Sequence, residues 1–362
     1  MTNQRMDKTS LKFLREWFKK NAAELPWRLA DLDAPRDPYA VWISETMLQQ
    51  TQVSTVREYF IRWMKRFPNV EALAAAEESE VLRYWQGLGY YSRAKNILKT
   101  ARIVAEHKEF PFTRKELEAL PGIGAYTAGA ILSLAYHQRE AILDGNLVRI
   151  FSRLYALNFL PTDKKSKSAT SAPIDVYWNY AREVADSPKA YMHNEALMEL
   201  GRTVCKIKNP ECADCPFHAD CKAFAENRVS EFPPSKKHVQ KDWHGTVLII
   251  ESADHKILAV HGGQKFFKNQ FTLPHFESPR NATAGIPAQA ETFVGPDQIE
   301  SVKVIGKFQH GITVHKIECD VLHIQTNSKA PASRNAEIQW VDIKHAQDFF
   351  ANSFCLKALA LL

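Results

Sequence analysis

Four cysteines in one short stretch constrain this chain more than any other feature of its sequence. They follow the spacing Cys-x6-Cys-x2-Cys-x5-Cys, and the whole chain of 362 residues has only six cysteines. Four thiolates this close in sequence can converge on one point, and a tetrahedral shell of four sulfurs suits zinc or an iron–sulfur cluster. The four residues are Cys205, Cys212, Cys215 and Cys221.

Three kinds of structure can use such a group of cysteines. A pair of disulfides is the least favoured, because nothing marks the chain as secreted and cytosolic thiols stay reduced. Structural zinc sites usually have two Cys-x2–4-Cys halves separated by a longer loop. Here one close pair, Cys212 and Cys215, lies between two wider gaps. The spacing therefore favours a 4Fe–4S cluster in the loop 205–221, with zinc as the main alternative.

The bulk properties are those of a two-domain globular protein. The length suggests two domains, and the 24% charged and 45% hydrophobic residues are ordinary for such a protein. A net charge of +6 fits nucleic-acid binding. No apolar run approaches the ~18 residues of a membrane span. The N-terminus predicts a helix with Leu11, Leu14, Trp17 and Phe18 on one face. We expect no membrane partner and a cytoplasmic location, at the nucleoid if the source is bacterial.

The pattern of the chain changes once. Residues 1–228 predict a helical domain, because apolar residues recur at intervals of three and four. Paired prolines and clustered charges at 229–242 indicate an interdomain linker. Residues 243–362 contain β-rich runs bounded by turn residues and a closing helix, SFCLKALALL. The clearest helical patterns are at 39–60, 79–85, 94–104, 127–135 and 193–204.

A glycine-containing turn between two helices is the second strong signal. In LPGIGAYTAGAIL, residues 120–132, Gly122 and Gly124 permit a tight turn, and the second helix then starts with exposed amides. Such amides attract a phosphate without any basic side chain, and a contact to the phosphate does not depend on the base sequence. An ordinary connector between helices is the alternative.

A carboxylate follows about twenty residues later. Asp144 ends an apolar run and precedes Gly145 and Asn146, which are turn-forming residues. At such a position the side chain can cap the next helix, and capping is the structural alternative to a catalytic role.

The hairpin, the Asp-Gly-Asn turn and the cysteine loop, in this order and spacing, resemble the endonuclease III superfamily of base-excision DNA glycosylases. Within it the chain resembles the MutY adenine DNA glycosylases from about residue 25 to 224, with a weaker match beyond. The resemblance implies a helix-hairpin-helix domain with a 4Fe–4S cluster, followed by a Nudix-like domain. It rests on the segments LPWR (25–28), SETMLQQT (44–51), GLGYYSR (87–93), the hairpin, DGN (144–146) and NEAL (194–197).

The resemblance also implies catalytic roles. Glu45 would protonate adenine at N7, and Asp144 would stay ionised to stabilise positive charge on the sugar, a division of labour known from glycoside hydrolysis. Tyr126 would hydrogen-bond the pair of carboxylates, and together with Asn146 it would orient Asp144 and the attacking water. Relatives that also cleave the strand have a lysine where this chain has Tyr126, so we expect a monofunctional enzyme.

The implied partner is double-stranded DNA with adenine opposite 8-oxoguanine or guanine, bound by a monomer. Since the base must leave the stack to react, the resemblance assigns Gln50 and Tyr90 as wedges in the duplex. Trp27, Arg28 and Glu195 would line the adenine pocket.

The resemblance assigns recognition of 8-oxoguanine to the C-terminal domain. The family's reading loop carries Phe-Ser-His, where this chain has Ile312, Thr313 and Val314. Thr313 keeps a hydroxyl, but Val314 has no donor. His315 is one residue later, and one step along a strand points to the opposite face. We therefore expect weaker discrimination at this loop.

Two other functions remain open. One is a thymine or uracil mismatch glycosylase of the same superfamily, which the context of Glu45 disfavours. The other is a non-catalytic iron–sulfur DNA-binding protein, which the pairing of Glu45 with Asp144 disfavours.

Overall fold

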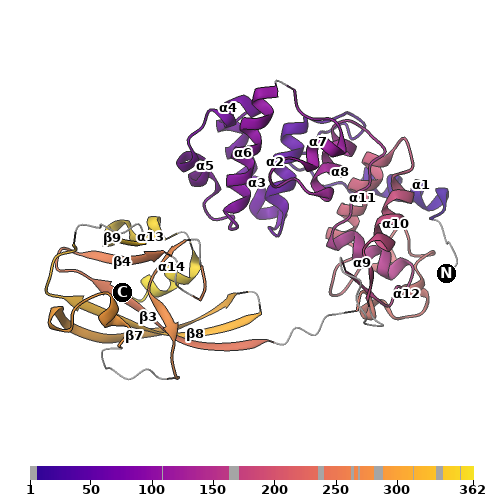
Figure 1. The fold of residues 1–362 in the computed structure, drawn as a ribbon. Coiled ribbons are helices and arrows are strands. Elements are labelled where there is room, and N and C mark those ends of the chain that lie inside the picture. Colours follow the sequence, from indigo (N-terminus) through magenta and orange to yellow (C-terminus); the bar gives the residue numbers. More distant parts are fainter. Residues whose placement is uncertain are drawn as a thin grey trace. The chain divides into compact units, whose positions relative to one another are not determined.

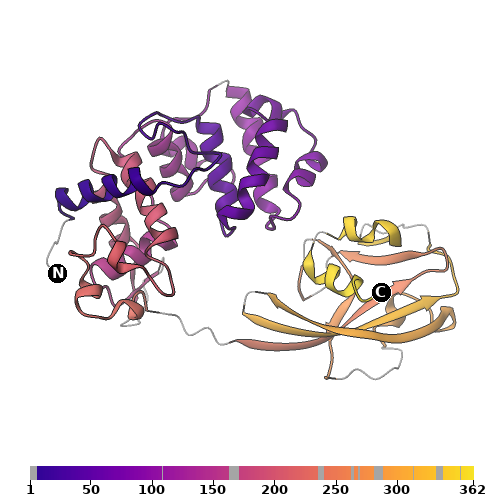
Figure 2. The same cartoon turned by 180° about the vertical axis from the view of Figure 1, so that it is seen from behind.

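The computed structural model describes residues 6–107, 109–162, 171–234, 240–261, 265–267, 270–280, 288–312, 314–331, 337–350 and 352–362. The chain divides into two compact units, Met1–Lys236 and Lys237–Leu362. The first unit is mainly helical, and the second is built around a β-sheet (Figures 1 and 2). Among the described residues, no helix has the length and apolarity needed to cross a bilayer.

The first unit is built mainly of helices, as the periodicity predicts. A small parallel pair of strands, β1 (Leu160–Thr162) and β2 (Ser171–Pro173), is the exception. The helices are α1 (Lys8–Asn21), α2 (Pro38–Leu48), α3 (Val53–Arg66), α4 (Val70–Ala74), α5 (Glu78–Trp85), α6 (Ser92–His107), α7 (Arg114–Glu118), α8 (Ala125–Leu134), α9 (Gly145–Leu154), α10 (Asp175–Ala185), α11 (Ala190–Thr203) and α12 (Lys222–Ala225).

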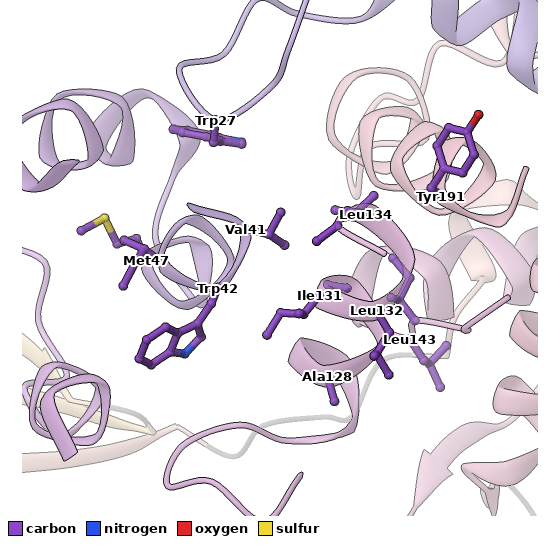
Figure 3. Packing of buried hydrophobic residues seen from close by; sticks show 14 of the residues in the cluster. Trp27, Val41, Trp42, Met47, Ala128, Ile131, Leu132, Leu134, Leu143 and Tyr191 are labelled. Atoms are coloured by element: carbon purple, nitrogen blue, oxygen red, sulfur yellow. The ribbon is translucent and has the colours of Figure 1, made fainter. Parts of the chain in front are cut away.

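Helices α2 and α8 form the centre of this unit. Both are apolar on nearly every side, as expected of helices that are buried all round. Figure 3 shows Trp42 of α2 and Ile131 of α8 among the packed side chains. Gly129 allows close packing here, because a Cβ at that position would lie 2.3 Å from the carbonyl oxygen of Ala141. These two rigid helices carry Glu45 and Tyr126.

One predicted helix is divided in the structure. The pattern at 39–60 forms α2 and α3, and the chain between them leaves the helical conformation at Gln49 and turns left-handed at Gln50, whose φ is +57°. The N-terminal helix is confirmed, with Leu11, Leu14 and Phe18 buried.

The second unit has a mixed sheet in the order β5-β4-β3-β8-β7, with β6 paired to β3 and β9 to β4. Strands β3 and β8 are parallel, and β7 and β8 form a long antiparallel hairpin in which Ile312 pairs with His315. Helix α14 (Ser353–Leu359) packs on the sheet through Phe354, Cys355 and Ala358. The remaining elements are β3 (Lys241–Glu251), β4 (Lys256–His261), β5 (Phe271–Thr272), β6 (His275–Glu277), β7 (Ile299–Ile312), β8 (His315–Thr326), β9 (Ile338–Asp342) and α13 (Ala346–Phe349).

The ends of the predicted linker 229–242 belong to the two units. Phe232 is buried in the first unit, where its carbonyl oxygen accepts a hydrogen bond of 3.0 Å from Arg153 Nε. Lys241 already belongs to β3 of the second unit. The connecting segment is therefore shorter than its composition predicts, because apolar Phe232 packs back onto α9.

Candidate active site

A groove of about 1250 Å³ opens on the first unit. It brings together ten of the residues that the sequence singled out, although they come from distant segments of the chain. They are Trp27, Arg28, Glu45, Gln50, Gly122, Gly124, Tyr126, Asp144, Asn146 and Glu195.

Glu45 lies near the end of α2 and is only 5% exposed. Burial in this helix raises the pKa of the carboxyl to about 7, and the nearby carboxylates of Glu195 and Asp144 act in the same direction. Hydrogen bonding to Tyr126 and the charge of Arg36 oppose the rise. A carboxyl with this pKa exchanges its proton near neutral pH, which suits a general acid.

Tyr126 lies in the first turn of α8 and connects the two central helices. Its hydroxyl donates a hydrogen bond of 2.6 Å to Glu45 Oε2 and lies 3.2 Å from Met198 Sδ. Burial, together with the charges of Glu45 and Asp144, holds the pKa of Tyr126 well above its usual value. The phenol therefore keeps its proton and serves as a fixed donor. The structure shows the hydrogen bond to Glu45, one of the two carboxylates that the resemblance pairs with Tyr126.

Asp144 is the N-cap of α9, so the structural role suggested by the sequence is real. Its Oδ1 accepts from Leu147 N at 2.8 Å, and its Oδ2 accepts from Asn146 Nδ2 at 2.9 Å. Burial raises the pKa of this carboxyl, while these donors and Arg149 favour its charged form. Capping fixes the carboxylate at the wall of the groove, so the capping role and a catalytic role can coexist.

Arg149 lies behind Asn146 and was not singled out from the sequence. Its Nη2 donates to Asn146 Oδ1 at 2.8 Å and to Gly201 O at 2.7 Å. Its Nε donates to Cys205 O at 2.7 Å. The signal that could have found Arg149 is its position. It follows Asn146 by about one turn on the amphipathic helix α9, so the two side chains lie on the same side of the helix.

Trp27, Arg28 and Glu195 lie at the other side of the groove. Arg28 Nε donates to Glu195 Oε1 at 2.7 Å, and Arg28 Nη2 donates to Glu199 Oε2 at 3.1 Å. Trp27 packs edge-on against Phe60, with ring centroids 5.5 Å apart. These contacts hold a buried polar wall beside Glu45.

Three members of this wall were missed in the sequence. Arg36 pairs with the second carboxylate oxygen of Glu195, and Arg202 pairs with Glu199. The spacing of Glu195, Glu199 and Arg202 on α11, at intervals of four and three, was the signal that could have found two of them. Arg36 carries no local signal, because its partner is 159 residues away.

Gln50 and Tyr90 lie at the protein surface, and both have left-handed backbone conformations. Their φ angles are +57° and +48°. Gln50 is exposed at the edge of the groove. Tyr90 is 61% exposed and does not line the groove. Their side chains are free to contact a ligand.

The predicted hairpin is confirmed between α7 and α8. Gly122 has a φ of +80°, and a Cβ there would lie 2.8 Å from Asn96 Cβ, so a glycine is needed. Gly124 is the N-cap of α8, and no side chain caps the helix. The first amides of α8 therefore remain available to an anion at the groove.

The four cysteines line a second, smaller cavity, of about 30 Å³, together with apolar side chains such as Leu154, Leu200 and Phe217. Burial and the neighbouring thiols raise the pKa of Cys215 to about 12, so a bound cation is needed to draw off its proton. In the described part of the chain, no three His, Cys, Asp or Glu side chains are arranged to hold a metal ion. The four cysteines share one cavity, but their sulfurs do not form a closed ligand shell in this structure.

The proposed lesion-reading loop joins β7 to β8 in the second unit. Thr313 lies outside the described residues. Val314 is in the turn, and its carbonyl oxygen accepts from Lys241 N at 2.9 Å. The His315 ring lies against Phe266, with centroids 5.5 Å apart.

Comparison with known proteins identifies the family. Residues 43–175 match the HhH-GPD superfamily of base excision DNA repair proteins. The adenine DNA glycosylase of Buchnera aphidicola subsp. Baizongia pistaciae is 30% identical over 327 residues, which are 89% of this chain and 88% of that protein. The chain belongs to the adenine DNA glycosylase family. The mouse adenine DNA glycosylase is 42% identical over 217 residues, or 58% of this chain and 41% of the mouse protein.

As a member of the adenine DNA glycosylase family, the protein is a DNA N-glycosylase of base excision repair. The solved structure of a thermostable thymine-DNA glycosylase aligns with 60% of this chain and with 95% of that glycosylase's chain, with a TM-score of 0.50 and 23% sequence identity. That likeness supports the helical fold.

Proposed function

We propose that this protein hydrolyses the N-glycosidic bond of adenine mispaired with 8-oxoguanine or guanine, without cleaving the DNA strand. The observation that carries the proposal is a buried carboxyl, Glu45, with a pKa near neutrality, in the same groove as the hydrogen-bonded carboxylate of Asp144. Different environments for two carboxyl groups indicate an acid and a charged partner.

In the proposed reaction, protonated Glu45 donates its proton to adenine N7. Adenine then leaves as a neutral base, which avoids the cost of expelling an anion. Positive charge develops on the sugar, and Asp144 stabilises it electrostatically, because Asn146 and the amide of Leu147 keep its charge in place. Water completes the hydrolysis and leaves an abasic site. Tyr126 holds Glu45 in position during these steps.

Access to the base requires extrusion from the duplex, which costs a few kcal/mol. The exposed side chains of Gln50 and Tyr90 would fill the space that the base leaves. The uncapped N-terminus of α8, after Gly122 and Gly124, would bind a backbone phosphate. Trp27, Arg28 and Glu195 would bind the adenine ring and its polar edge. DNA binding of this kind is sequence-independent at the phosphates and specific at the base.

The 4Fe–4S cluster, bound by Cys205, Cys212, Cys215 and Cys221, would cross-link the C-terminal part of the helical unit. It would supply four Fe–S bonds that hold the loop 205–221, and the chemistry at the sugar needs no redox step. The position of all four cysteines at one cavity supports a shared cofactor, and their spacing, with one close pair between two wider gaps, favours the cluster over zinc.

For the second unit we propose a Nudix-like domain that reads 8-oxoguanine through the loop at Thr313. Ile312 and His315 face each other across the β7–β8 hairpin, and neither Ile312 nor Val314 offers a side-chain donor. A missing hydrogen bond is worth ~0.5–1.5 kcal/mol, so the preference for 8-oxoguanine over guanine should be modest.

A single-turnover assay tests the activity. Duplexes with adenine opposite 8-oxoguanine, guanine or cytosine are incubated with excess enzyme, and a duplex with thymine opposite guanine tests the rival mismatch glycosylase. We expect release of adenine from the first two and strand breaks only after alkali. Release of thymine from the T:G duplex, or efficient nicking without alkali, would refute the assignment.

The pH profile follows from the environment of Glu45. The acid acts while protonated, so the rate should fall as pH rises through about 7. Tyr126→Phe removes a donor that favours the carboxylate, so it should raise the pKa of Glu45 and move this alkaline limb to higher pH. Tyr136→Phe is the matched control, because the Tyr136 hydroxyl binds the remote Phe110 carbonyl. If the alkaline limb of the pH–rate profile lies at the same pH in Tyr126→Phe as in the wild type, Glu45 is not the acid that titrates.

Truncation tests the division of labour between the units. Removal of residues 237–362 should spare excision of adenine opposite guanine, because Glu45 and Asp144 both belong to the first unit, which has its own core. The preference for 8-oxoguanine should fall toward unity. The measurement is the ratio of single-turnover rates on the two duplexes, and a ratio unchanged by truncation would show that the second unit is not the reader.

The cluster is tested by composition. Anaerobically purified protein should carry about four irons and four sulfides per chain. Cys212→Ser should lower the iron content and solubility, whereas Cys319→Ser, which changes a buried cysteine of the second unit, should leave the iron content unchanged. Stoichiometric zinc in the anaerobic wild-type protein would contradict the cluster.

A further inference from the structure

One guanidinium connects the two loops that carry Gln50 and Tyr90. Arg93 lies in the first turn of α6. Its Nη1 donates to the carbonyl oxygen of Gln49 at 2.6 Å, and its Nη2 donates to the carbonyl oxygen of Gly89 at 3.3 Å. These two carbonyls belong to the peptide groups that lead directly into Gln50 and Tyr90.

Most of the other hydrogen bonds of Arg93 follow the same division. Nη1 also donates to the carbonyl oxygens of Thr46 and Met47, at 2.8 and 3.2 Å, which end helix α2. Nη2 also donates to Leu88 O at 3.1 Å, and to Thr51 Oγ1 of the Gln50 loop at 3.5 Å. Each terminal nitrogen thus serves mainly one loop, and the positive charge lies where the unpaired carbonyls of a helix C-terminus favour a cation.

Gln50 and Tyr90 need such support. Left-handed backbone conformations are unfavourable for residues other than glycine, and they persist where surrounding structure fixes them. The Arg93 guanidinium fixes the carbonyl that precedes each of them, and its carbon lies 5.5 Å from the centre of the Tyr90 ring. The two loops therefore have a common anchor.

We propose that Arg93 is a positioning residue for base extrusion, which sets the Gln50 and Tyr90 side chains as one wedge. The inference rests on the proposed function, since it takes these two residues as the wedge. Arg93 lines neither the groove nor the cysteine cavity, so it acts through the two loops and not on the reacting atoms.

The variant Arg93→Lys separates the effect of the guanidinium's two hydrogen-bonding nitrogens from the effect of its positive charge. Lysine keeps the cation but has one nitrogen, so it cannot bind both loops in fixed geometry. Arg102→Lys is the matched control, because Arg102 belongs to the same helix and also donates to backbone carbonyl oxygens, those of Ala74 and Ala76, at 3.3 and 3.1 Å. Thermal midpoints are measured for both variants.

Extrusion is measured directly with 2-aminopurine, which replaces adenine opposite 8-oxoguanine. The fluorescence of 2-aminopurine increases when this base leaves the stack. Both lysine changes are made in the Glu45→Gln background, which blocks excision. We expect Arg93→Lys to lose most of the fluorescence increase, and in the active enzyme to lower the single-turnover rate about tenfold. Arg102→Lys should stay within twofold of its parent in both measurements.

A double-mutant cycle excludes a merely structural effect. If Arg93 acts through the wedge, Arg93→Lys should change the rate less than threefold once Gln50 and Tyr90 are both alanine, because neighbours in one mechanism are not additive. Equal rate losses with and without the wedge would overturn the proposal, as would wild-type fluorescence in Arg93→Lys. If the lysine variant does not fold, Arg93→Gln serves the same cycle.

Failure of the proposed function would be recognised separately. If the wild-type enzyme neither releases adenine nor extrudes 2-aminopurine, the function is wrong whatever Arg93 does. If the wild type does both and Arg93→Lys matches it, only the role of Arg93 is wrong.

Discussion

Glu45→Gln should lower the single-turnover rate of adenine release by about 10²–10⁴-fold, the usual contribution of a positioned general acid. The amide oxygen can still accept the hydrogen bond from Tyr126, so the shape of the groove and the affinity for mispaired DNA should be nearly unchanged. The amide has no acidic proton to give to adenine N7. The measurement is single-turnover kinetics together with a binding titration.

Glu58→Gln is the control for this variant. Glu58 is exposed on α3, which follows α2 directly, so it reports what the loss of a surface charge does to DNA binding. Its rate should equal that of the wild type. Wild-type turnover by Glu45→Gln would mean that another group protonates the base.

Asp144→Asn should lower the rate by at least about 100-fold, the usual cost of losing one electrostatic contact to the transition state. Asparagine caps helices about as well as aspartate, so α9 and the stability of the protein should survive. The negative charge opposite the sugar is lost, and with it the stabilisation of the developing positive charge. Rates and thermal midpoints measured on the same sample separate these two effects.

Asp37→Asn provides a matched change at another N-cap. Asp37 caps α2 by accepting from the amides of Tyr39 and Ala40, so it tests the cap without touching the groove. Both variants should keep their thermal midpoints, and only Asp144→Asn should lose activity. A large loss of stability in Asp144→Asn alone would assign Asp144 to folding.

The parts of the fold that sequence could predict are those with a local cause. The strand-forming runs of the second unit, the amphipathic α1 and the turn at Gly122 each follow from residues close in sequence. The convergence of four cysteines on one cavity could be predicted because their spacing is short.

The parts that could not be predicted depend on distant contacts. The break between α2 and α3 contains neither proline nor glycine, and Arg93 binds its carbonyl at Gln49 from 44 residues away. The same holds for Arg36, which precedes α2 and whose partner Glu195 lies on α11, 159 residues away. The periodicity of apolar residues shows which side of a helix is buried, but it does not show which charged residues from distant segments form ion pairs.

The first turn of α8 has a consequence for how the enzyme searches a genome. Its open amides can hold any phosphate, damaged or not, while its Tyr126 hydroxyl remains bonded to Glu45. Contact with undamaged DNA therefore need not disturb the acid, which stays buried until an extruded base enters the groove. Because phosphate contacts of this kind allow a protein to slide along a duplex, we expect the enzyme to scan long tracts of intact DNA without cutting adenine from normal pairs.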